Sequence, residues 1–200
     1  MEKKVFGYPK YDDNGEMILT TYENEYRDML MDIRVYKLEK NQTKIFTSDD
    51  EEIAVLLLNG KIEINVDGIE KIVSRKSVFL EGPYAGHVSH SKIISAKALE
   101  ETEVLVQKTK NKVTFKSKLY TPEDAPWKYS SQGWYGNVAN RRVNTIIDHD
   151  IEPKSNMVLG EVLNDPGNWS GYLPHRHPQP ECYYFLFDHK LFLLQTPQKY

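Results

Sequence analysis

The sequence predicts an all-β protein of the sandwich or barrel type, and three observations support this fold class. Short stretches rich in valine, isoleucine and leucine recur at intervals of roughly ten residues. Turn-forming pairs such as Asn59-Gly60 and Asp67-Gly68 separate them. Only one segment, residues 23–32, has the composition of a short helix. Short strands at this spacing, with turns between them, are typical of sandwiches and barrels.

The first group of strands is expected between residues 53 and 107. Residues 53–58 form an apolar run typical of a buried strand, and Asn59-Gly60 predicts a tight hairpin turn after it. Residues 61–66 alternate strictly, so Ile62, Ile64 and Val66 should face the interior. The other strands expected in this group are, in chain order, 69–73, 77–80, 91–98 and 103–107.

The composition changes between residues 117 and 136, where prolines, glycines and aromatic residues lie among polar ones, as in an ordered linker. A second β series follows this linker. Its expected strands are 141–147, 156–163, 169–177 and 181–187, with a turn at 165–168. We therefore expect three parts, residues 1–116, 117–136 and 137–200.

Charge and composition narrow the classes of function. The net charge is −3 and no basic stripe interleaves with aromatics, which argues against a nucleic-acid-binding protein. The longest apolar run, 53–58, is too short to cross a bilayer, and the first residues lack the apolar core of a signal peptide. Cys182 is the single cysteine, which fits a cytoplasmic protein, and we expect it to be a small buried residue rather than a nucleophile.

The strongest chemical signal is the pair His175 and His177 followed by Glu181. On a strand, residues two apart point to the same face, so the two imidazoles would project together. Two imidazoles and a carboxylate suit a divalent zinc, manganese or iron ion with an open coordination position. The competing interpretation is a solvated surface loop, which Pro178 and Pro180 would favour.

The other histidines point to no second site. His87 and His90 are three residues apart, so on a strand they face opposite sides, and we expect them to be structural or solvated. His149 lies in a polar turn. The sequence has no phosphate-binding glycine motif and no Gly-x-Ser-x-Gly elbow.

The second half of the chain resembles a known family. The segments that carry the resemblance are 142–148, 155–162, 166–177 and 180–185, above all Leu-Gly-Glu-Val followed by Pro-Gly-Asn-Trp-Ser. They are similar to the 5-deoxy-glucuronate isomerases of myo-inositol breakdown and to their relatives, the 5-dehydro-4-deoxy-glucuronate isomerases of pectin breakdown. The Pro-Gly-Asn-Trp-Ser motif is more similar to the isomerases of myo-inositol breakdown than to those of pectin breakdown.

This resemblance implies a bicupin, that is, two cupin β-barrels in tandem. The first barrel (1–116) would be metal-free, and the second (137–200) would hold a divalent metal through His175, His177, Glu181 and a later histidine. Because members of the family continue for several dozen residues beyond this chain's end, we expect the second barrel to be incomplete, as in a C-terminally truncated product. His189 has the right parity to replace the later histidine, but the intervening prolines weaken that argument.

The reaction that the resemblance implies is an aldose–ketose isomerisation of 5-deoxy-glucuronate to 5-dehydro-2-deoxy-gluconate, by a cytoplasmic homo-oligomer. Since Glu181 would be a ligand, Tyr183 on the same strand face is the catalytic candidate, unless it is a barrel-filling aromatic. Arg142 is the candidate partner of the substrate carboxylate. The alternatives are a degenerate cupin that binds a sugar acid or metal without catalysis, and another metal cupin such as a dioxygenase.

Overall fold

The computed structural model describes residues 7–23, 25–169 and 177–188, which form β-strands and loops apart from one turn of 3-10 helix. The helix is η1 (Arg27–Met29). The strands are β1 (Glu16–Thr20), β2 (Met31–Leu38), β3 (Thr43–Thr47), β4 (Glu51–Val66), β5 (Ile69–Arg75), β6 (Ala85–Val88), β7 (Ile93–Ala98), β8 (Thr102–Lys110), β9 (Lys118–Tyr120), β10 (Lys128–Ser130), β11 (Arg141–Ile147) and β12 (Leu159–Leu163). None of these described elements is a helix long and apolar enough to cross a membrane.

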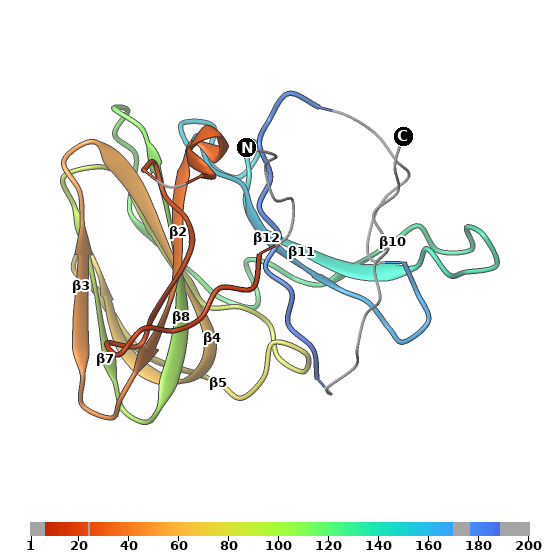
Figure 1. Cartoon of the computed structure of the whole chain (residues 1–200), viewed down its shortest axis with the longest axis horizontal. Helices are drawn as coiled ribbons and strands as arrows, with labels where there is room; N and C mark the ends of the chain where they lie inside the picture. The colour runs from red at the N-terminus through yellow and green to blue at the C-terminus, as the bar shows by residue number, and fades with distance from the viewer. Residues whose placement is uncertain (1–6, 24, 170–176, 189–200) are drawn as a thin grey trace.

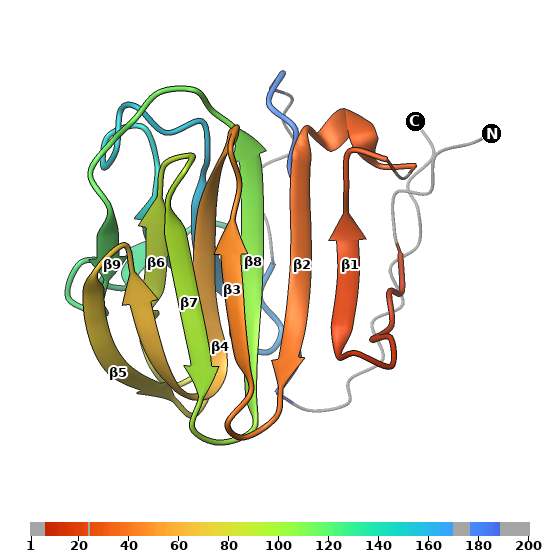
Figure 2. The same ribbon diagram turned by 90° about the vertical axis from the view of Figure 1, so that its left-hand side faces the viewer.

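The first half of the chain forms two antiparallel layers that share one strand. The long sheet has the order β1-β2-β8-β4-β6-β9, and the short sheet has the order β3-β7-β4-β5. Figure 2 shows the two layers, with β3 and β7 of the short sheet in front of β4 and β8. The all-β prediction is therefore confirmed, and the first half is a closed sandwich in which β4 contributes to both layers.

Strand β4 passes through the pair Asn59-Gly60, so the predicted hairpin turn is wrong. The register against β8 shifts between Leu57 and Asn59, as at a β-bulge. Gly60 has φ +100° and lies against the backbone of Glu101 and Thr102, where a side chain would collide. The positive φ that favours a turn here bends one strand from the long sheet into the short sheet. The Asp67-Gly68 turn is confirmed between β4 and β5.

Two apolar cores lie on the two faces of the long sheet. The inner core lies between the sheets and includes the inward residues Ile62, Ile64 and Val66, as the alternation predicted. The outer core lies on the opposite face, where Ala54, Leu56 and Leu58 of β4 alternate with the inward positions. A strand that is apolar on both faces reads as a continuous apolar run, which explains the sequence of residues 53–58.

The second half covers the outer core with a separate three-stranded sheet of order β10-β11-β12. Ile146 and Ile147 of β11 and Leu159 of β12 are buried in the outer core beside the β4 residues. Figure 1 shows this sheet extending from the side of the sandwich. The first and second halves are thus joined by a shared apolar core as well as by the chain.

Several predicted elements differ from the structure. The helix expected at 23–32 is only the short η1, and residues 77–80 form a turn closed by a hydrogen bond from Leu80 N to Ser77 O. The expected linker contains β9, which pairs with β6, and β10, which pairs with β11. Residues 181–187 form no strand, so that prediction is wrong, while β11 spans the predicted 141–147. The strand expected at 169–177 lies mostly outside the described residues.

Buried tyrosines make the fold sensitive to alkali. Burial raises the pKa of Tyr36 to about 12 and the pKa of Tyr120 to about 12, both from an ordinary value of 10.0. Between these values the unfolded chain loses phenol protons that the folded chain keeps, so the free energy of unfolding should fall as pH rises from 10 to 12. Urea unfolding across this range tests the slope, and Tyr36→Phe should reduce it. Full phenolate absorbance in the folded protein at pH 11 would contradict the prediction.

Candidate functional site

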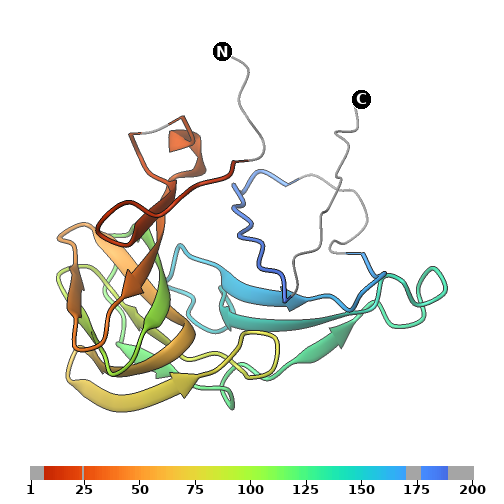
Figure 3. The ribbon, with the colours of Figure 1, turned by 60° about the horizontal axis from the view of Figure 1, so that its bottom comes forward.

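Residues 177–188 run as a loop beside the sheet β10-β11-β12 (Figure 3). Tyr184 anchors this segment by packing against the outer core. Its neighbours Tyr183 and Phe185 are exposed, and their rings stack with centroids 6.1 Å apart. The anchor therefore fixes which side chains of the segment are presented outward.

His177 and Glu181, two of the predicted metal ligands, converge. His177 Nε2 lies 3.2 Å from Glu181 Oε1. Two ligand atoms about 2.1 Å from one zinc ion in tetrahedral geometry lie roughly 3.4 Å apart. The observed separation is that of a direct ion pair between the two side chains, and it is also close to the spacing of two ligand atoms on one cation. Solvent reaches both side chains, so a ligand can approach them.

The third predicted ligand, His175, lies outside the described residues, as does His189. Among the residues that the structure describes, no group of three or more histidine, cysteine, aspartate or glutamate side chains could hold a metal ion. The structure thus places two of the three predicted ligands together and leaves the third as a prediction.

Tyr183 extends the same cluster. Its hydroxyl donates a hydrogen bond to Glu181 Oε2, 3.2 Å away. Partial burial and the negative charge of Glu181 raise the pKa of Tyr183 above its ordinary value, while the positive charge of Arg141 acts in the opposite direction. The phenol is therefore protonated at neutral pH, which suits a hydrogen-bond donor or acid better than a base. Its exposed ring does not fill a barrel interior.

Arg141, which sequence reasoning passed over, lies closer to this chemistry than Arg142. The two residues are neighbours on β11, so they point to opposite faces of the sheet. Arg142 points to the side where its guanidinium lies 3.8 Å from Asp165 and 6.0 Å from the centre of the Trp127 ring. Arg141 is buried and donates to Ser131 Oγ and to the Ala139 carbonyl. From the sequence, the alternation of side chains along β11 shows that Arg141 and Arg142 face opposite sides. Choosing between them also requires the position of Tyr183, which the sequence does not give.

Other sequence expectations have mixed outcomes. His87 is structural, as predicted, because it is fully buried beside Glu52 and Phe115. His90 lies with its Nδ1 3.1 Å from the hydroxyl of its neighbour Ser91. The prediction that Cys182 is buried is wrong, because the residue is exposed on the segment 177–188. The inner core of the sandwich consists of apolar side chains.

Comparison with known proteins assigns the chain. Residues 7–198 match the model of the KduI/IolB family. The chain belongs to this family. A 5-deoxy-glucuronate isomerase from Geobacillus kaustophilus is 30% identical over 173 residues, which are 84% of this chain and 59% of that protein. A protein of the same name from Geobacillus thermodenitrificans is 29% identical over 185 residues, 90% of this chain and 64% of the relative.

The fold comparison agrees with this KduI/IolB assignment. The crystal structure of an IolB-like protein from Salmonella typhimurium LT2 matches with a TM-score of 0.58 and 16% identity, over 69% of this chain and 52% of that one. At this level of identity the match shows a common fold. The chain spans about three fifths of the length of the curated KduI/IolB relatives that it matches.

Proposed function

We propose that this KduI/IolB protein takes part in the isomerisation of 5-deoxy-glucuronate to 5-dehydro-2-deoxy-gluconate in myo-inositol breakdown, with a divalent metal in a second cupin barrel. The relatives named 5-deoxy-glucuronate isomerase support the substrate. The observation that carries the proposal to this chain is the convergence of His177 and Glu181 within 3.2 Å. His175 and a further histidine would complete the ligand set.

The side chains of the site have separable roles in this proposal. The reaction moves one hydrogen from C2 to C1 of the open-chain sugar and one hydroxyl proton from O2 to O1. A divalent ion held by His177 and Glu181 would stabilise negative charge on those two oxygens. Tyr183, which donates a hydrogen bond to Glu181, would pass the hydroxyl proton between them. Arg141, whose positive charge acts on Tyr183, would supply positive charge near the uronate carboxylate.

The test is metal content together with turnover. The purified chain should retain about one equivalent of zinc, manganese or iron after dialysis, and it should convert 5-deoxy-glucuronate to the ketose, as followed by NMR. Stoichiometric metal without turnover would favour the alternative of a binding-only degenerate cupin. Absence of both metal and turnover would contradict the proposal.

The two neighbouring arginines provide a matched prediction. Arg141→Gln should raise KM for the uronate by roughly tenfold or more, because a charged hydrogen bond to the carboxylate is lost. Arg142→Gln on the opposite face of β11 should leave KM within about twofold, since the Arg142 guanidinium lies near Asp165 and the Trp127 ring. Steady-state kinetics with both variants decide the point. A larger effect of Arg142→Gln would place the carboxylate on the other face.

A further inference from the structure

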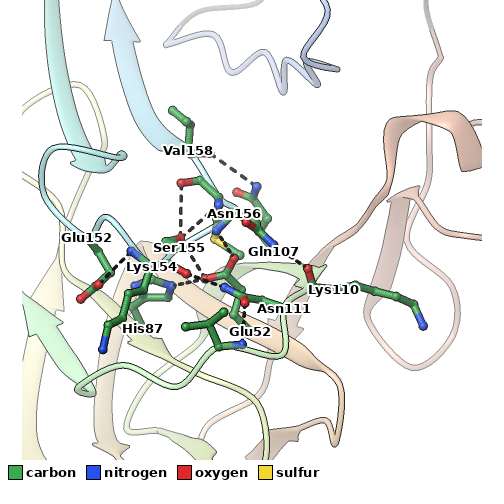
Figure 4. A network of polar contacts seen from close by, with 12 residues as sticks. Glu52, His87, Gln107, Lys110, Asn111, Glu152, Lys154, Ser155, Asn156 and Val158 are labelled. Atoms are coloured by element: carbon green, nitrogen blue, oxygen red, sulfur yellow. Dashed lines mark hydrogen bonds and ion pairs between the residues drawn. The ribbon is translucent and has the colours of Figure 1, made fainter.

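A row of polar side chains on the long sheet binds the backbone of residues 154–158, the segment that leads into β12. Asn111 Nδ2 donates to the Lys154 carbonyl at 2.7 Å, and Gln107 Nε2 donates to the Val158 carbonyl at 3.5 Å. Asn156 returns a bond from its Nδ2 to the Lys110 carbonyl at 3.0 Å. Figure 4 shows these bonds connecting the end of the sandwich to the segment above it. The contacts act along the whole segment, so they fix its path over the sheet.

Glu52 is the centre of this contact. It is fully buried, and its Oε1 accepts the Asn156 backbone N–H at 2.7 Å. Its Oε2 accepts the Ser155 hydroxyl at 2.8 Å and lies 3.1 Å from His87 Nε2 (Figure 4). Both carboxylate oxygens are therefore used, one by a backbone donor and one by two side chains. Packing of the His87 ring against Phe115, with centroids 4.6 Å apart, holds the imidazole behind the carboxylate.

A buried carboxylate with such partners contributes more to the positioning of its partners than to the stability of the fold. Moving a charge from water into a protein interior is costly, and an apolar residue would fill the same place without that cost. An apolar residue makes no directional hydrogen bonds, so it cannot select one backbone N–H and one hydroxyl as partners. Glu52 thus selects a single placement of Ser155 and Asn156 on the sandwich. The outer core then continues through Met157 and Leu159 into β12.

We propose that Glu52 is a positioning residue of the second-half site, through which the sandwich fixes residues 154–158, β12 and the segment that carries His177 and Glu181. The inference rests on the proposed function for its link to the metal. β12 ends at Leu163, and the turn at 165–168 that follows it leads to the segment with His177 and Glu181. Tyr184 of the segment 177–188 packs against the same outer core as Met157 and Leu159, so a shift of residues 154–158 on the sandwich would reach that segment through this core.

The experiment compares Glu52→Gln and Ser155→Ala with Glu63→Gln in the full chain. Glu52→Gln keeps the volume but replaces one accepting oxygen with an NH₂ group, and Ser155→Ala removes a single hydroxyl in case the first variant folds poorly. Glu63 is a matched control because it lies exposed on the short sheet, where its carboxylate pairs with Lys97. Amide hydrogen exchange and Mn²⁺ affinity, followed by electron paramagnetic resonance, are measured for each.

Exchange at residues 154–163 should accelerate by roughly tenfold or more in both test variants, while amides of β3, β5 and β7 keep their wild-type protection. Mn²⁺ affinity should fall in step by about fivefold or more, because the two regions are coupled. Glu63→Gln should change neither.

Equal loss of protection throughout the sandwich would overturn the proposal, since Glu52 would then be only a core residue. Unchanged exchange and affinity would overturn it too. If the wild type binds no Mn²⁺, the proposed function fails, and the exchange pattern alone then decides whether Glu52 positions the segment.

Discussion

His177→Ala and Glu181→Gln should each lower metal content and isomerase activity by at least about 100-fold, the largest functional effect expected in this chain. The reason is geometric, because the two side chains lie 3.2 Å apart and would be joint ligands of the proposed cation. Removing either leaves a site with too few donors to compete with water for the ion. Metal analysis of the dialysed variants, together with turnover of 5-deoxy-glucuronate, measures the loss.

His149→Ala is the matched control for this experiment. His149 is an exposed histidine in the loop after β11, and it lies outside the cluster of His177 and Glu181. The control should keep wild-type metal content and turnover, which separates the loss of a ligand from the loss of any imidazole. Retention of stoichiometric metal and turnover by His177→Ala would remove this residue from the proposed ligand set.

Glu161→Ala should destabilise the fold by about 3 kcal/mol, because it leaves a buried guanidinium without its counter-charge. Arg75 is fully buried, and Glu161 of β12 binds it with two hydrogen bonds of 2.7 and 2.8 Å. The remaining donors of Arg75 bind the carbonyls of Leu57 and Glu81. Urea unfolding, with the midpoint and slope compared to the wild type, measures the change.

Two further variants make this prediction specific to a buried pair. Replacement of both partners, Arg75→Met with Glu161→Met, should recover much of the lost stability, because neither charge is then left buried alone. Glu63→Ala removes the carboxylate from an ion pair with Lys97 in which both side chains are about half exposed, and it should cost less than about 1 kcal/mol. If Glu161→Ala lowers the free energy of unfolding no more than Glu63→Ala does, the Arg75–Glu161 ion pair contributes no more to stability than a surface pair.

The fold was predictable where one local pattern determines one element. The alternation of residues 61–66 gives the inward face of β4, and residues 141–147 are the strand β11. The Asn59-Gly60 pair misled because the positive φ of a glycine serves a strand bend as well as a hairpin turn. Whether Gly60 turns the chain or bends it depends on β8, which comes forty residues later in the sequence.

The candidate site was predictable only in its local part. Residues 177–183 are close in sequence, so their side-chain types and spacing predict a metal cluster, and the structure brings His177, Glu181 and Tyr183 together. The contacts that hold the second half in place have no such signal. Glu52 and Ser155 are 103 residues apart, and Arg75 and Glu161 are 86 residues apart. Glu52 ends a run of four acidic residues, 49–52, and nothing in that run indicates which carboxylate is buried or what its distant partner is.

The shared strand β4 has a consequence for synthesis on the ribosome. Its neighbours β5, β6, β7 and β8 all follow it in the chain, and the edge of residues 51–59 that pairs with β8 stays unpaired until Lys110 has been made. During that interval the nascent chain presents an unpaired edge of a mostly apolar strand that can pair with other chains. Protection of β4 by a ribosome-associated chaperone would therefore be most valuable while residues 67–110 emerge.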